Sequence, residues 1–187
     1  MYKNIEIEIK GVAPLIMHNG QTADPLNKFS RAIKEISGKR NKTDADHEKM
    51  ARLEWEAGLY MDLNGVIVVP SKCIEACLVA ASKKNKLGKQ FTAGVMCPDV
   101  NYPLIYKGSK DIDKLYADGF YLRELVRIGT SKIVRTRPMF TEWSLKFKIA
   151  YLDDVVTKDQ VMQAIDAAGQ LIGLCDYRPK YGRFEIV

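Results

Sequence analysis

The chain has 187 residues, of which 47% are hydrophobic and 28% are charged, a balance typical of a folded globular protein rather than a disordered one. No apolar run approaches the ~20 residues of a membrane span, and the N-terminus lacks a signal-peptide core, so we expect a cytoplasmic protein without a membrane partner. A formal net charge of +6 favours a polyanionic partner.

The cysteines and short motifs point away from metal and cofactor chemistry. Cys73, Cys77, Cys97 and Cys175 lie in apolar surroundings and include no CxxC pair of the zinc-ribbon kind. The sequence contains no P-loop, GxGxxG, nucleophile elbow or HExxH. We therefore predict no metal site, no cofactor and no enzyme of a cofactor-dependent class.

The first third of the chain predicts a strand followed by helices. Residues 3–10 alternate isoleucines with charged side chains, the period of a half-buried strand. Two polar, helix-prone stretches follow in residues 24–36 and 44–56, the second with Thr43 as a good N-cap. We interpret residues 20–58, approximately, as an inserted helical lobe.

The rest of the chain predicts further strands and helices in alternation. Residues 66–69 read as a strand, 71–84 as a helix, 120–137 and 142–151 as strands, 158–172 as a helix opened by a capping box, and 182–187 as the last strand. Residues 85–119, approximately, are interpreted as an inserted loop region. Without the insertions the order is βαββαβ, so we predict one α+β domain over residues 1–187 with a ferredoxin-like, RRM-like core.

Three stretches of this sequence resemble a known family. They are "GVAPLIMHN" after the first strand, "VRTRPMFTEW" before a long strand and "DYRPKYGRFEI" at the end. In these stretches the chain resembles the repeat-associated mysterious protein (RAMP) superfamily. Within that superfamily it is most similar to the backbone subunits of CRISPR effector complexes and their stand-alone phage-encoded relatives. The resemblance implies a ferredoxin-like core, a glycine-rich loop before the last strand, and assembly along RNA in a bacterial or phage-infected cell. This chain has Gly182 in that loop but no dense run of glycines.

Basic side chains gather in several stretches that we interpret as phosphate contacts, with an ordinary solvated surface as the alternative for each. Arg135 and Arg137 stand two apart on a predicted strand, so their heads lie on one face about 6.5 Å apart. We predict that they form a cationic strip with Arg178, Lys180 and Arg183 on a loop fixed by Pro179 and Gly182. The full set of candidate nucleic-acid-binding residues is Lys83, Lys84, Lys86, Lys89, Arg127, Lys132, Arg135, Arg137, Arg178, Lys180, Arg183, His18, Lys39 and Arg40.

Three functions stay open at this point. The first is a non-catalytic protein that binds single-stranded RNA or DNA and assembles side by side with copies of itself or with other effector-complex subunits. The second is a metal-independent endoribonuclease, because some members of the resembled superfamily use an N-terminal-region histidine as general base, which here would be His18. The third is an oligomeric scaffold or inhibitor that engages a protein partner.

Overall fold

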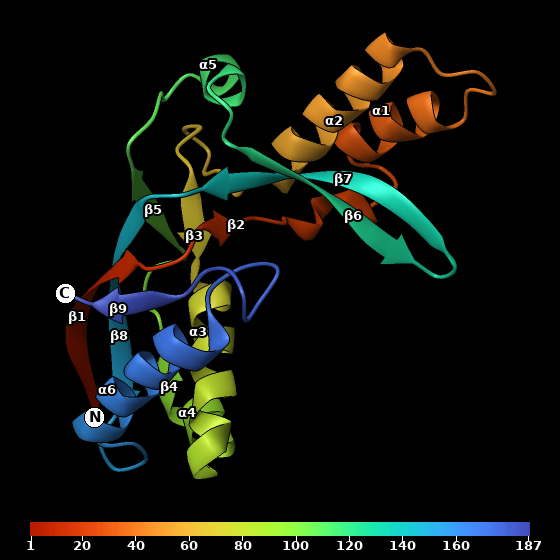
Figure 1. Ribbon diagram of the computed structural model, residues 1–187. Helices are drawn as coiled ribbons and strands as arrows, with labels where there is room; N and C mark the ends of the chain where they lie inside the picture. The colour runs from red at the N-terminus through yellow and green to blue at the C-terminus, as the bar shows by residue number, and fades with distance from the viewer. The chain divides into compact units, whose positions relative to one another are not determined.

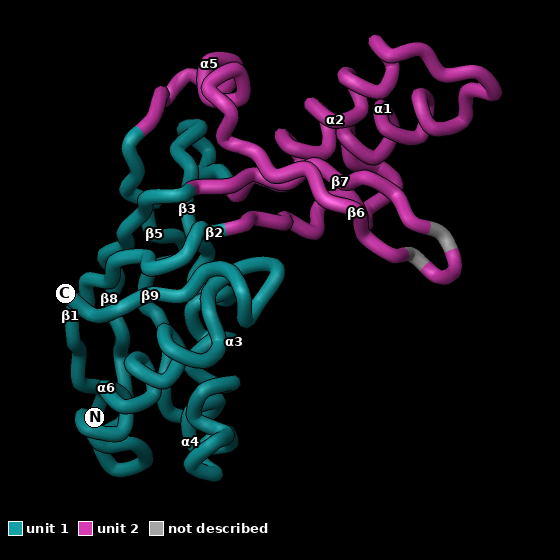
Figure 2. The backbone as a smooth tube through the Cα atoms, viewed as in Figure 1, with its two compact units in different colours: residues 1–15, 61–107, 141–187 teal, residues 16–60, 108–140 magenta. Residues whose placement is uncertain are grey.

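The computed structural model describes residues 1–127, 129–130 and 132–187, and the chain divides into two structural units (Figure 2). Unit 1 comprises residues 1–15, 61–107 and 141–187, and unit 2 comprises residues 16–60 and 108–140. The lobe expected at residues 20–58 belongs to unit 2. The region expected as a loop at residues 85–119 contributes to both units.

Unit 1 is built from one antiparallel sheet and three α-helices. Its strands are β1 (Tyr2–Gly11), β3 (Val68–Pro70), β4 (Val95–Met96), β5 (Asn101–Tyr106), β8 (Trp143–Leu152) and β9 (Phe184–Ile186). Its helices are α3 (Ser71–Ser82), η2 (Lys83–Asn85), α4 (Gly88–Gly94), α6 (Lys158–Ala167) and the π-helical turn η3 (Ala168–Ile172).

The strand order of unit 1 is that of a ferredoxin-like fold. The strands run β3-β5-β8-β1-β9, with β4 paired to β8, and α3 and α6 lie on one face of the sheet (Figure 1). The fold class is therefore α+β and ferredoxin-like with insertions, as the sequence predicted. No helix among the described residues is both long and apolar enough to cross a membrane.

One core strand differs from the prediction. The strand beside β8 is β5 (Asn101–Tyr106), whereas residues 120–137 form a separate hairpin in unit 2. Pro103 hid this strand from sequence reasoning, because proline lacks the N–H that a central strand ordinarily donates. The long alternation in residues 120–137 is real, but it belongs to a second sheet.

The core of unit 1 lies between its sheet and its helices. In β1 and β8 the odd-numbered residues point inward, so Ile7 faces Phe147 and Ile9 faces Leu145 in the register. Ile74 and Leu78 of α3 and Ile165 of α6 are buried as well. The alternation in the strands gives the sheet one apolar face, and the helical period gives each helix an apolar stripe. Packing the helices on the sheet removes both apolar surfaces from water.

The opposite face of this sheet is polar, and its charges are paired. The Lys146 Nζ forms an ion pair with the Glu8 carboxylate at 2.9 Å, and the Lys148 Nζ lies 3.5 Å from the Glu6 carboxylate. Each pair joins residues that are directly opposite in the register of β1 and β8. These four side chains therefore offer little net charge to a polyanion.

Unit 2 is built from a three-stranded sheet and helices. The sheet has the order β2-β7-β6, with β6 (Tyr121–Ile128) and β7 (Ser131–Phe140) forming an antiparallel hairpin. The short strand β2 (Leu15–Ile16) pairs with the other edge of β7, and its first residue is the last of the N-terminal segment of unit 1. The helices are η1 (Gly20–Ala23), α1 (Lys28–Ser37), α2 (Asp44–Gly58) and α5 (Ile112–Ala117). Thr43 and Asp46 form the capping box that opens α2.

An arginine fastens α5 to α2. The Arg52 guanidinium lies 4.7 Å from the ring centroid of Trp55 and 5.0 Å from that of Tyr116, and it pairs with Asp113 at 2.7 Å. The Trp55 indole N–H donates to the Phe120 carbonyl at 2.7 Å. Cation–π contacts of this kind keep an arginine charge satisfied while its planar head packs like an aromatic ring.

A buried carboxylate fastens the hairpin to α2. Glu54 is 6% exposed, and its two carboxylate oxygens accept from the Arg135 guanidinium and from the Thr136 backbone N–H, the latter at 3.1 Å. Thr136 is itself buried. Because a buried charge is costly unless it is paired and hydrogen-bonded, this arrangement fixes the hairpin against the helix.

We expect Glu54→Ala to lower the free energy of unfolding by about 3 kcal/mol, since it leaves a partly buried guanidinium and a buried amide without an acceptor. Glu56→Ala on the same helix is the matched control, because Arg52 keeps Asp113 when Glu56 at 3.7 Å is lost. That control should cost less than about 1 kcal/mol. Urea unfolding of both variants measures the difference, and equal costs would mean that the Glu54 contacts do not fasten the hairpin.

Candidate nucleic-acid interface

The segment between η3 and β9, residues 173–183, is here called the terminal loop, and its backbone is bonded at both ends. The Leu174 N–H donates to the Gly182 carbonyl at 2.8 Å, which closes the loop on itself. The Gly182 N–H donates to the Pro14 carbonyl at 2.8 Å, and the Val12 N–H donates to the Arg183 carbonyl at 2.9 Å. The loop is therefore tied to the end of β1.

Two glycines make this closure sterically feasible. Gly173 and Gly182 have φ values of +84° and +72°, in the region that side chains avoid. A Cβ at Gly182 would clash with the Leu174 carbonyl oxygen and would stand 2.8 Å from the Leu174 nitrogen. The backbones approach so closely that the position needs glycine for two separate reasons.

A buried thiol joins the terminal loop to α3. The Cys77 Sγ donates to the Gly173 carbonyl at 3.2 Å. Burial raises the pKa of the Cys77 thiol to about 12, so the thiol keeps the proton that this hydrogen bond requires. The cysteine that sequence analysis placed in apolar surroundings thus has a definite structural role.

The terminal loop carries three cationic side chains, two of them exposed and one half-buried. Arg178 and Lys180 are exposed, and the Lys180 ammonium lies 5.1 Å from the Tyr181 ring centroid. Arg183 is half-buried, and its Nε donates to the Pro179 carbonyl at 2.6 Å. Within the described part of the chain no ion pair involves these three residues, so their charge is not neutralised by a carboxylate.

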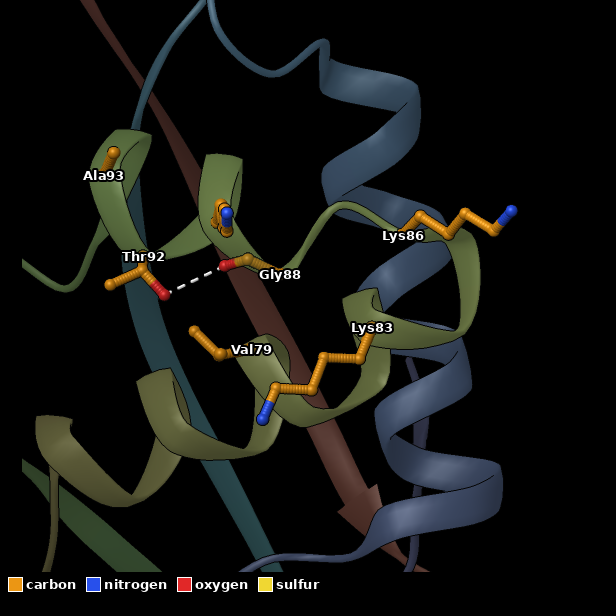
Figure 3. Close-up of a pocket in the computed structure, with 7 residues that line it drawn as sticks. Val79, Lys83, Lys86, Gly88, Thr92 and Ala93 are labelled. Atoms are coloured by element: carbon orange, nitrogen blue, oxygen red, sulfur yellow. Dashed lines mark hydrogen bonds between the residues drawn. The ribbon is translucent and has the colours of Figure 1, made fainter.

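A second cationic site lies where α3 ends and α4 begins. A cavity of about 750 Å³, here called the lysine cavity, is lined by Val79, Lys83, Lys86, Gly88, Lys89, Thr92 and Ala93 (Figure 3). No carboxylate lines it. The four lysines of the sequence-predicted cluster, Lys83, Lys84, Lys86 and Lys89, are all exposed.

The sequence-predicted residues of the hairpin lie in unit 2. Arg127 and Lys132 are directly opposite each other in the register, and the Arg127 Nε donates to the Gly129 carbonyl at 3.0 Å. Arg135 has Glu54 as its partner, so most of its charge is already balanced. Because Arg135 and Arg137 belong to unit 2 and the terminal loop belongs to unit 1, the predicted strip of five cations stays a prediction.

The remaining candidates also lie in unit 2. Lys39 pairs with Asp46 at 2.6 Å and braces the turn before α2, and its hydrogen bond is the main cause that lowers the pKa of Asp46 to about 2. Arg40 is exposed in the same turn. His18 is exposed, and its carbonyl accepts from the Tyr60 hydroxyl at 2.9 Å. Among the described residues no cluster of three or more His, Cys, Asp or Glu side chains is arranged for a metal ion.

Sequence reasoning missed two features of these sites. It did not identify Glu54 as the partner of Arg135, because the two residues lie 81 positions apart. It also did not identify the apolar part of the lining of the lysine cavity, which includes Val79 of α3 and Ala93 of α4. A pattern that could have indicated this apolar lining is the repeat of small or apolar residues on the exposed side of α3, at Ala76, Val79 and Ala80.

Comparison with known proteins gives a structural likeness only. No family model matches the chain, and no curated protein matches it. The chain is similar to one in the cryo-EM structure of the Type III-B Cmr-beta bound to cognate target RNA, with a TM-score of 0.53 and 12% identity over 100% of this chain. It spans 59% of the length of that chain. At this identity the likeness supports the fold.

We expect Gly182→Ala to destabilise unit 1 far more than Gly65→Ala. Gly65 also has a positive φ of +77°, but nothing lies within 4 Å of its added Cβ, so it isolates the cost of the backbone conformation, about 1–2 kcal/mol. Gly182→Ala adds overpacking against Leu174, about 1–3 kcal/mol more. Thermal melts of both variants compare the two costs, and equal shifts would show that the loop closure yields to a side chain.

Proposed function

We propose that this chain is a non-catalytic, RAMP-type protein that binds single-stranded RNA through its phosphate backbone. The observation that carries the proposal is the likeness of the whole chain to one in a Cmr-beta structure bound to cognate target RNA. The terminal loop also contains most of the last of the three stretches that resemble the superfamily. Backbone hydrogen bonds and the close approach at Gly182 fix the position of this loop.

The distribution of paired and unpaired charges supports this site. On the open face of the sheet, lysines face glutamates across neighbouring strands. On the terminal loop, Arg178 and Lys180 are exposed and have no carboxylate partner among the described residues. A polyanion releases more counterions where protein cations are not already neutralised, so the loop is the better phosphate ligand.

RNA binding should therefore depend on the loop cations and not on the sheet cations. We expect Arg178→Gln/Lys180→Gln to reduce the slope of log affinity against log salt by about 1.4, because each neutralised phosphate contributes about 0.7 on single strands. Lys146→Gln/Lys148→Gln removes the same charge from the sheet face and should leave the slope almost unchanged. Fluorescence anisotropy with a labelled RNA, and with a DNA of the same sequence, measures both slopes.

The outcomes of that titration are distinct. Failure of the wild-type protein to bind RNA at low salt would refute the proposed function. A loss of slope in the sheet variant instead of the loop variant would place the RNA on the open sheet face. The RNA is recovered after each titration, and cleavage that disappears in His18→Ala would support the endoribonuclease in place of a non-catalytic protein.

We further propose that the bound protein assembles side by side with copies of itself, each copy covering a few nucleotides. The exposed turn between α1 and α2, residues 37–43, supports this, because it gains little from its own burial to offset its ordering entropy. Mass photometry should show oligomers that grow with RNA length, and deletion of residues 37–43 should reduce their size. Oligomers of wild-type size without RNA would favour the scaffold function instead.

A further inference from the structure

The lysine cavity and the terminal loop are neighbours on α3. Residue 79 of α3 lines the lysine cavity, and residue 80 lines a second cavity of about 580 Å³ that includes Arg178 and Pro179 of the terminal loop. Cys77, about one turn earlier in α3, contacts the start of the terminal loop, because its Sγ donates a hydrogen bond to the Gly173 carbonyl. The two cationic sites of unit 1 are therefore separated only by the outer face of one helix.

The face of α3 between the two sites carries small side chains. Two carboxylates adjoin it: Glu75, which accepts from the Cys97 backbone N–H at 2.8 Å, and Asp176, which lines the second cavity. Ala76, Val79 and Ala80 are exposed or half-buried along α3 and carry small or apolar side chains. From Cys77 to the end of α3 is five residues, or about 8 Å of helix rise. A stacked single strand advances about 3.4 Å per nucleotide, so roughly two nucleotides span this distance.

The lysines of the cavity are spread out rather than converging. Figure 3 shows the Lys83 side chain crossing the cavity beside Val79, while the Lys86 side chain extends away from it in another direction. Gly88 makes room for the first of these, because a Cβ there would stand 2.9 Å from the Lys83 Cγ. A compact anion needs ammonium groups that meet at one point, whereas successive phosphates of a strand need them spaced along a line.

We infer that the lysine cavity is a second phosphate-binding site, which receives the nucleotides that follow those on the terminal loop as the strand crosses the outer face of α3. The inference rests on the proposed function, because it extends the path of the same strand. Its ligand is the phosphodiester backbone, recognised without reference to base sequence. The site adds binding only to a strand long enough to reach from Arg178 to Lys83.

The test is a length series of single-stranded RNA from about 4 to about 16 nucleotides, the range of site sizes for single-strand binders. Wild-type protein should gain affinity and salt slope in two steps as the RNA lengthens. Lys83→Gln/Lys86→Gln/Lys89→Gln should lose the second step, with a slope lower by about 2 on long RNA and an unchanged slope on the shortest RNA that binds.

The matched control removes three charges elsewhere on unit 1. Lys10→Gln/Lys146→Gln/Lys148→Gln lowers the net charge equally on the open sheet face and should keep both steps. A thermal melt of each variant checks that the fold is retained. All six substituted lysines lie on the surface, where a change usually alters the free energy of unfolding by no more than about 0.5 kcal/mol.

The results separate the two proposals. Absence of binding by the wild-type protein at every length would refute the proposed function. If the wild-type protein binds in two steps and the triple lysine variant keeps the same salt slope, the second site is overturned and the proposed function is not. The exposed lysines would then be free to serve another ligand, such as an acidic protein.

Discussion

The close approach of the Leu174 and Gly182 backbones is the contact on which the candidate interface depends. Their hydrogen bond of 2.8 Å closes the terminal loop, and the bond from Gly182 to Pro14 ties it to the first strand. Both bonds require that no Cβ stand at Gly182. Arg178 and Lys180 therefore project from a backbone whose position is fixed before any ligand binds, which reduces the entropy lost on binding.

Internal pairing of charges decides where a polyanion can bind this molecule. Several of the described basic side chains have a carboxylate within ion-pair distance, among them Lys146 and Lys148 on the sheet and Arg135 beside Glu54. The cations of the terminal loop and of the lysine cavity have none among the described residues. Part of the formal charge of +6 that no carboxylate neutralises therefore lies beside α3, on the terminal loop and in the lysine cavity.

The predictable part of the fold and the missed part have different physical origins. Alternation in β1 and β8, the N-cap at Thr43 and the capping box at Thr157 are local patterns, and each was found in its predicted place. The strand β5 was missed because Pro103 contradicts a central strand unless its neighbours are known. The pairing of Glu54 with Arg135 was missed because no local pattern relates residues so far apart in the chain.

The sequence by itself determined the α+β class, the position of most core elements and the identity of the loop that needs glycine, because periodicity, capping and turn chemistry act over a few neighbouring residues. It also identified the clusters of basic residues. Only the tertiary structure decided which cations are neutralised, that residues 120–137 form a hairpin apart from the core sheet, and that Lys83 and Arg178 flank the same helix. Electrostatic pairing and sheet membership depend on distances through space, which a linear pattern of residue types does not encode.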